Sequence, residues 1–232
     1  MKDLFGKAIL DFQTNNDPQT LITETNISEP DEMDVAYLFR DFDQMPKIEQ
    51  QALKLCSGKI LDVGCGAGSH SLYLQQMNQQ VVSIDISENA IKACHLRGVK
   101  NPINMNLLDV VDKFDTILLL MNGTGIFGTL NQTDLYLKKL KSLLNKTGQI
   151  LIDSSDIIYM FDDDEDGGKW IPTDTYYGEL EFTITYKEES EVPFPWLYLD
   201  YNTLQNAAFA NGLQCELVEE GAHFDYLARL FV

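Results

Sequence analysis

Glycines and two carboxylates mark the part of the sequence best suited to chemistry. The segment "KILDVGCGAGSHSLYLQ" places Asp62 at the end of an apolar run and then three glycines within five residues. Gly64 and Gly66 let a ligand approach the backbone closely because no side chain intervenes. Asp62 would repel a pyrophosphate but attract an ammonium group. Asp85 follows 21 residues after Gly64, where a carboxylate can accept both hydroxyls of a ribose. Together they predict a site for a nucleoside with a cationic tail.

Other glycine-rich turns fit this segment less well. A dinucleotide fold requires G-x-G-x-x-G, but the third position here is Ser69, and the extra glycine, Gly68, comes one residue early. The GK[ST] ending of a Walker phosphate loop is absent from the segment. The structural alternative is an ordinary strand-to-helix turn in another α/β protein. It would require Asp62, the two glycines and Asp85 to coincide by accident, so we favour the nucleoside site.

The elements around this turn alternate between strands and helices. We expect strands at 59–63, 80–86, 102–108, 114–121 and 149–156, and helices at 68–78, 87–98 and 132–148. Short connections between them predict a parallel sheet with right-handed crossovers. Two regions do not follow this alternation of strands and helices. Residues 1–58 contain a polar stretch followed by helical segments, and residues 156–200 contain an acidic loop followed by two β-rich runs.

Three motifs, "ILDVGCGAG", "VVSIDIS" and "FDTILLL", resemble class I S-adenosylmethionine-dependent methyltransferases in their order and spacing, over roughly residues 58–155. The resemblance implies a doubly wound α/β fold with a seven-stranded, mostly parallel sheet whose last strand is antiparallel. It implies S-adenosylmethionine as cofactor and one domain over 1–232. The expected parts are a helical cover (1–58), a cofactor-binding core (59–155), an inserted loop and hairpin (156–200), and a terminal helix and strand pair (201–232).

The resemblance also implies the cofactor contacts. The methionine part and the sulfonium would face the glycine turn and the loop after the fourth strand, namely Asp62, Gly64, Cys65, Gly66, Leu120, Met121 and Asn122. Asp85 would bind the ribose, and Ile86 would pack on the adenine. Asn106, with Leu107 beside it, takes the position that reaches the adenine amine, unless the alignment selects Asp109 instead.

Arg40 is the only arginine before the glycine turn. A guanidinium binds a carboxylate in a bidentate fork, which makes Arg40 a candidate for the carboxylate of the cofactor. The alternative is a surface ion pair with Asp41 or Asp43, and the sequence does not decide between the two. If Arg40 binds the cofactor, the segment from Tyr37 to Arg40 closes over it, and Tyr37 becomes a candidate acceptor contact.

Several other residues invite a functional label. Trp170, with Tyr176, Tyr177 and Trp196, either forms an aromatic box for a cationic or flat acceptor or packs within the inserted hairpin. We interpret His70 as a residue that begins a helix and packs or hydrogen-bonds locally. The sequence names no catalytic base, so the catalytic residues stay unassigned.

Composition narrows the class of partner. The net charge of −19 arises from 36 acidic and 17 basic residues, and there is no basic stripe for nucleic acid or an anionic membrane surface. A neutral or cationic small molecule meets no such repulsion.

No signal peptide is evident, and the four scattered cysteines suit a reducing cytoplasm and no metal site. The acidic run at 162–168 misses the EF-hand spacing, so we expect a solvated loop.

These observations predict a cytoplasmic methyltransferase that acts on a small molecule. One alternative is an aminopropyl transferase on the same fold, although the acidic motifs for a polyamine are not found. Another is a catalytically silent module that binds S-adenosylmethionine for regulation, because methyl transfer need not leave a residue signature. The sequence leaves the formation of a homodimer open.

Overall fold

The computed structural model describes residues 2–163, 168–171 and 174–232. Within that part, a main sheet of seven strands has the order β11-β12-β7-β6-β3-β4-β5. Its strands are β3 (Lys59–Val63), β4 (Gln80–Asp85), β5 (Pro102–Asn104), β6 (Phe114–Leu119), β7 (Leu144–Ser155), β11 (Gln214–Glu220) and β12 (Asp225–Phe231). The strands from β5 to β7 are parallel, whereas β12 is antiparallel to both neighbours. The expected seven-stranded sheet with an antiparallel last strand is confirmed.

Helices cover both faces of the main sheet because its strands are apolar on both sides. Ile60 packs in a cluster with α2 (Lys47–Leu55) and α3 (Ser69–Gln76), while the next residue, Leu61, packs with α5 (Leu130–Leu143) and α6 (Tyr201–Ala210). The helix α4 (Glu88–Arg97) begins at the capping hydroxyl of Ser87 and ends at Gly98 in a left-handed conformation. Because side chains alternate along a strand, Asp62 lies on the α2 and α3 side with Ile60.

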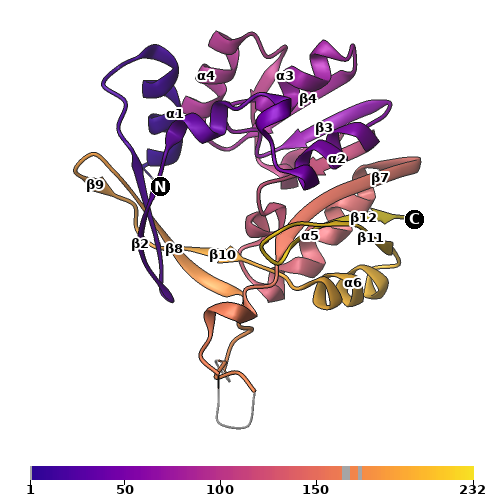
Figure 1. The fold of residues 1–232 in the computed structure, drawn as a ribbon. Helices are drawn as coiled ribbons and strands as arrows, with labels where there is room; N and C mark the ends of the chain where they lie inside the picture. Colours follow the sequence, from indigo (N-terminus) through magenta and orange to yellow (C-terminus); the bar gives the residue numbers. More distant parts are fainter. Residues whose placement is uncertain (1, 164–167, 172–173) are drawn as a thin grey trace.

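A second, antiparallel sheet stands beside the main one (Figure 1). Its strand order is β10-β8-β1-β2, and a short strand, β9, pairs with the C-terminal end of β8. The strands are β1 (Leu21–Thr25), β2 (Ser28–Met33), β8 (Glu179–Tyr186), β9 (Glu189–Ser190) and β10 (Phe194–Leu197). Leu21 pairs with Tyr186, and both side chains are fully buried. The inserted hairpin is therefore joined to the N-terminal segment through β1 and β8.

The expectation of a helical N-terminal cover needs correction, since β1 and β2 lie within it. Helical turns are present there as well, in α1 (Leu4–Thr14), η1 (Val35–Phe39) and η2 (Phe42–Gln44). β1 pairs with the adjacent β2 on one side and with β8, about 160 residues away, on the other, so no local pattern reveals the pairing with β8. The remaining short helices are η3 (Leu107–Asp109), η4 (Gly123–Phe127) and η5 (Ile158–Met160). Residues 164–167 of the acidic loop lie outside the described part.

No helix in the described ranges has the length and apolar character needed to cross a membrane.

Candidate cofactor and acceptor site

The strand order of the main sheet creates a natural crevice. The chain proceeds from β3 to β4 and β5 on one side, and then returns to β6 and β7 on the other. Ligands of open α/β sheets bind at the carboxyl ends of the strands where the order reverses in this way. The loops after β3 and β6 therefore frame the candidate site, and they carry the glycine turn and the segment from Leu120 to Asn122.

The glycine turn is held open by Asp85. Gly64, Gly66 and Gly68 all have positive φ, at 69°, 52° and 82°. The Asp85 carboxylate accepts the Gly66 N–H at 2.9 Å and the Ser87 N–H at 2.8 Å. Burial raises the pKa of Asp85, although these two amides lower it. A Cβ on Gly66 would meet only the Gly64 carbonyl oxygen, at 4.0 Å, so open space lies above this residue.

Asp62 lies beneath the turn. Its side chain is 3% exposed and accepts the Ser71 hydroxyl at 2.6 Å, which in turn is 2.6 Å from the Ser83 hydroxyl. Burial raises the pKa of Asp62. The side chain of Cys65 is also buried, with its Sγ 3.9 Å from the Sγ of Cys94. Asp62 thus supports α3 and contributes negative charge below the turn.

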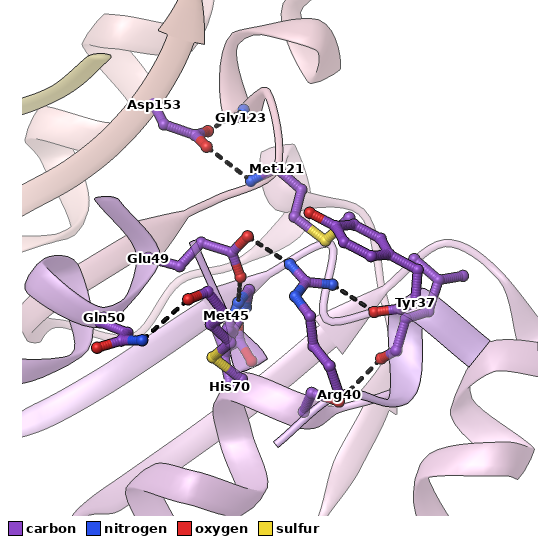
Figure 2. Close-up of polar contacts among 12 residues, drawn as sticks. Tyr37, Arg40, Met45, Glu49, Gln50, His70, Met121, Gly123 and Asp153 are labelled. Atoms are coloured by element: carbon purple, nitrogen blue, oxygen red, sulfur yellow. Dashed lines mark hydrogen bonds and ion pairs between the residues drawn. The ribbon is translucent and has the colours of Figure 1, made fainter. Parts of the chain in front are cut away.

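Arg40 belongs to a buried ionic network rather than to the surface (Figure 2). It is 7% exposed and forms an ion pair with Glu49, whose other carboxylate oxygen is 2.6 Å from His70 Nε2. The alternative of a surface pair with Asp41 or Asp43 was wrong. His70 lies buried in the first turn of α3, as expected, but its hydrogen bond is not local, because its partner Glu49 belongs to α2. Arg40 Nε has no hydrogen-bond partner within the described residues, which leaves a donor for a further acceptor.

The network favours its charged forms. Burial would raise the pKa of Glu49, but the hydrogen bond and charge of His70, together with Arg40, lower it below the usual value. Burial would lower the pKa of His70, but the hydrogen bond to Glu49 and the charge of Asp62 raise it. Arg40 and His70 therefore share one carboxylate beside the predicted site.

Tyr37 forms the outer side of this network. The Arg40 guanidinium carbon lies 3.9 Å from the centre of the Tyr37 ring, within the range of a cation–π contact. Figure 2 shows the Met121 side chain pointing toward the same ring. Because the ring is 45% exposed, one part of it packs on the network and another part remains open.

The loop after β6 has an unusual backbone. Met121 and Asn122 both have positive φ, although neither is glycine. Asp153 on β7 accepts the Met121 N–H at 2.9 Å and the Gly123 N–H at 2.8 Å. The side chain of Leu120 packs against the cluster on the α2 and α3 side. Met121 and Asn122 are half-buried at the mouth of the crevice.

Sequence reasoning missed Glu49 and Asp153. Glu49 lies in the first turn of a short amphipathic helix, where an acidic residue is usual. Asp153 follows an apolar run, "QILID", in the same way as Asp62 follows "KIL". That repeated acid at the end of a buried strand was the available signal.

The predicted adenine side is more open. Ile86 is 61% exposed, which is unusual for an isoleucine and leaves its surface free for a flat ring. The Asn106 side-chain oxygen accepts the Leu108 N–H at 2.8 Å, and an amide oxygen retains a second lone pair. Leu107 is buried, whereas Asn106 and Asp109 are exposed. The choice between Asn106 and Asp109 stays a prediction.

A cavity of about 940 Å³ lies between the second sheet and the edge of the site. Tyr37, Phe182 and Tyr198 contribute aromatic surface to it. Its charged lining residues are Glu24, Glu29, Asp31, Lys47, Glu220 and Asp225. Trp170 is 72% exposed and is not among the lining residues in the part of the chain that the structure describes, so its role as an acceptor contact stays a prediction.

Comparison with known proteins identifies the family. A family model for a methyltransferase domain matches residues 56–191. The chain is 45% identical to an S-adenosylmethionine-dependent methyltransferase from Bacteroides fragilis, solved in complex with S-adenosylhomocysteine; the TM-score is 0.92, and the match covers 100% of this chain and 95% of that one. The chain belongs to the S-adenosylmethionine-dependent methyltransferases.

Curated relatives of this methyltransferase are more distant. It is 30% identical over 122 residues to the ubiquinone biosynthesis O-methyltransferase of Pelagibacter ubique, covering 50% of this chain and 48% of that protein. It is 29% identical over 155 residues to the probable S-adenosyl-L-methionine-dependent methyltransferase TehB of Haemophilus influenzae, covering 62% of this chain and 48% of that protein. The chain spans about half the length of the curated relatives it matches.

The geometry of the methyltransferase fits its cofactor. Open space above Gly66 and an exposed Ile86 leave room for a ligand along the crevice. Asp85 offers carboxylate oxygens for the ribose, and Arg40 retains a buried Nε–H that has no partner among the described residues. The individual contacts to the cofactor stay predictions.

Proposed function

We propose that this methyltransferase transfers the methyl group of S-adenosylmethionine to a small, neutral or cationic molecule held in the cavity. The position of Tyr37 carries the proposal, because its ring packs on Arg40 beside the predicted cofactor site and also lines the cavity. The cavity volume of about 940 Å³ falls within the roughly 300–1,000 Å³ typical of small-molecule sites.

The charge of the lining supports a neutral or cationic acceptor. Glu24, Glu29 and Asp31 from the β1–β2 hairpin line the cavity together with Glu220, at the end of β11, and Asp225, at the start of β12. Lys47, the one lysine among the lining residues that the structure describes, is already paired with Glu219. A carboxylate or phosphate group would therefore enter against repulsion, whereas an amine would not.

The chain would act mainly by positioning. Bound S-adenosylmethionine supplies a methyl group that its sulfonium has already activated. Tyr37 and Tyr198 would orient the acceptor against this group and exclude water, an effect of proximity and orientation. No protein base is required when the attacking atom is a neutral amine or another soft nucleophile. The four cysteines are buried free thiols, which favours a reducing cytoplasmic setting.

A labelled-methyl experiment tests the proposal. Small molecules from a cell extract are separated by ion exchange into cationic, neutral and anionic fractions. Each fraction is then incubated with the protein and methyl-labelled S-adenosylmethionine. We expect label to enter the cationic or neutral fraction in step with release of S-adenosylhomocysteine. Transfer confined to the anionic fraction, or to material retained by a filter that holds macromolecules, would contradict the proposal.

A further inference from the structure

The turn after β6 adopts a conformation that requires support. Met121 and Asn122 have φ of 66° and 58°, two successive left-handed residues without a glycine. Such a backbone persists only where its surroundings hold it. The next residue, Gly123, is packed so closely that an added Cβ would lie 2.5 Å from the Leu119 Cβ. The turn therefore has one tightly constrained shape.

Asp153 supports the turn through two backbone amides. Its Oδ2 accepts the Met121 N–H at 2.9 Å, and its Oδ1 accepts the Gly123 N–H at 2.8 Å, so the carboxylate brackets Asn122. The hydroxyl of Ser154 lies 3.1 Å from the side-chain oxygen of Asn122 and holds the same turn from the neighbouring position. Figure 2 shows the two dashed contacts from Asp153 to the turn.

This carboxylate is costly to keep ionised. It is 4% exposed, and burial raises the pKa of Asp153 to about 7 despite the amides of Gly123 and Met121. The groups that face it are Glu49 from α2, which raises the pKa further, and the phenols of Tyr37 from η1 and Tyr198 after β10. A buried carboxylate partnered only by backbone amides carries a desolvation cost that its hydrogen bonds must offset. We therefore attribute the presence of Asp153 to the turn that it holds rather than to a gain in folding stability.

We propose that Asp153 is a positioning residue whose ionised carboxylate holds the Met121–Asn122 turn in the shape that receives the cofactor. Protonation of Asp153 puts a hydrogen on one of the two oxygens that accept the amides, so the strained turn loses part of its support. Cofactor binding then weakens although Asp153 itself need not touch the ligand. The inference concerns cofactor binding and holds for any methyl acceptor.

Calorimetry with S-adenosylhomocysteine tests it. In the parent, affinity should rise by up to about tenfold between about pH 6 and about pH 8, because the ionised fraction of a group with a pKa near 7 changes by that factor. In Asp153→Asn, the NH₂ group replaces one of the two oxygens that accept the amides of Met121 and Gly123, so one of these amides loses its acceptor. It should bind about tenfold more weakly at the higher pH and lose this part of the pH dependence. The control Asp134→Asn alters an exposed aspartate that pairs with Lys138 on α5 and should match the parent.

The free energy of unfolding should depend on pH in the opposite direction to the affinity for the cofactor product. The native pKa of Asp153 is raised from 3.8 to about 7, so the native state binds more protons than the unfolded state between these values. The contribution of Asp153 to stability should therefore fall with rising pH across that window, while the affinity for S-adenosylhomocysteine rises near its upper end. A purely structural role would change only the stability.

The proposal is overturned if Asp153→Asn binds S-adenosylhomocysteine as tightly as the parent at about pH 8. Should the variant not fold, the parent alone decides. The amide proton signals of Met121 and Gly123 should then shift together with pH, with a midpoint that matches the change in affinity. Signals that stay constant while the affinity changes would also overturn it.

Discussion

Asp85 performs two tasks at one position. It fixes the glycine turn by accepting the amide of Gly66, and it positions the N-cap residue of α4 by accepting the amide of Ser87. Each carboxylate oxygen can accept more than one hydrogen bond, so binding a ribose does not require these contacts to break. The same atoms that shape the turn thus remain available to the ligand.

Replacement of this carboxylate should weaken cofactor binding. Asp85→Ala removes charge-assisted hydrogen bonds worth about 1.5–3 kcal/mol each, which corresponds to at least about a tenfold loss of affinity for S-adenosylhomocysteine. Calorimetry measures the loss, and Asp112→Ala, which removes an exposed aspartate paired with Lys59, serves as the control. Unchanged affinity in a folded Asp85→Ala variant would contradict the assignment.

Gly66 allows a cleaner steric test. Gly66→Val places a side chain in open space where the cofactor is predicted to lie, so the surrounding strand and helix need not move, although the left-handed φ of 52° strains any side chain there. We expect no thermal shift with S-adenosylhomocysteine. Gly98→Val is a matched control, because Gly98 also has a positive φ, of 88°, and open space around it, but lies at the end of α4. Equal ligand-induced shifts in both variants would exclude a close approach at Gly66.

Residues of the glycine turn could be predicted because the sequence pattern that marks them spans only a short stretch of the chain. Asp62, Gly64, Gly66 and Asp85 were recognised from short spacings within and after one strand. Glu49 could not be recognised in this way, because its role depends on Arg40 and His70, which reach it from separate segments.

At the scale of elements, the ionic network joins η1, α2 and α3. Arg40 follows η1, Glu49 belongs to α2 and His70 to α3. A buried charge that loses its partner is strongly destabilising, so each of the three residues restrains the position of the other two elements. The N-terminal segment is thereby attached to the helix that follows the glycine turn.

Arg40→Leu tests whether this network also serves the cofactor. The substitution keeps apolar bulk and removes the charge, while Glu49 retains His70 as a partner. Adenosine lacks the carboxylate and should bind the variant and the parent alike, whereas S-adenosylhomocysteine should bind the variant at least several-fold more weakly. Arg229→Leu is the control, since it removes a partly exposed arginine that pairs with Glu216 on the β11–β12 pair and should bind both ligands as the parent does.

The other outcomes are equally informative. Equal loss of affinity for both ligands would make Arg40 a structural residue. Unchanged affinity for both would show that backbone amides hold the carboxylate instead, and Arg40 would then serve only the network with Glu49.

Across the whole molecule, the main sheet was predictable, whereas of the second sheet only the antiparallel pairing of the two β-rich runs within 156–200 was expected. Alternating apolar strands and helices define the main sheet one segment at a time, each with its own caps and turns. The β1 strand, "LITET", buries mainly one end and owes its register to β8, far along the chain. The cavity wall contributed by Glu24 and Phe182 depends on that pairing, so the acceptor site required the structure.

Hydrogen exchange tests how the whole molecule assembles around the cofactor. The contacts predicted for the methionine part of the cofactor come from three distant segments, 34–40, 64–69 and 120–124, which meet only in the folded chain. At saturating S-adenosylhomocysteine, amides in these segments that exchange through local opening should slow by roughly tenfold or more, because bound ligand disfavours each opening. The exposed side of α6 and the β1–β2 hairpin should exchange at unchanged rates. Protection at 64–69 and 120–124 without any at 34–40 would show that the N-terminal segment does not cover the cofactor, and that Tyr37 serves the cavity alone.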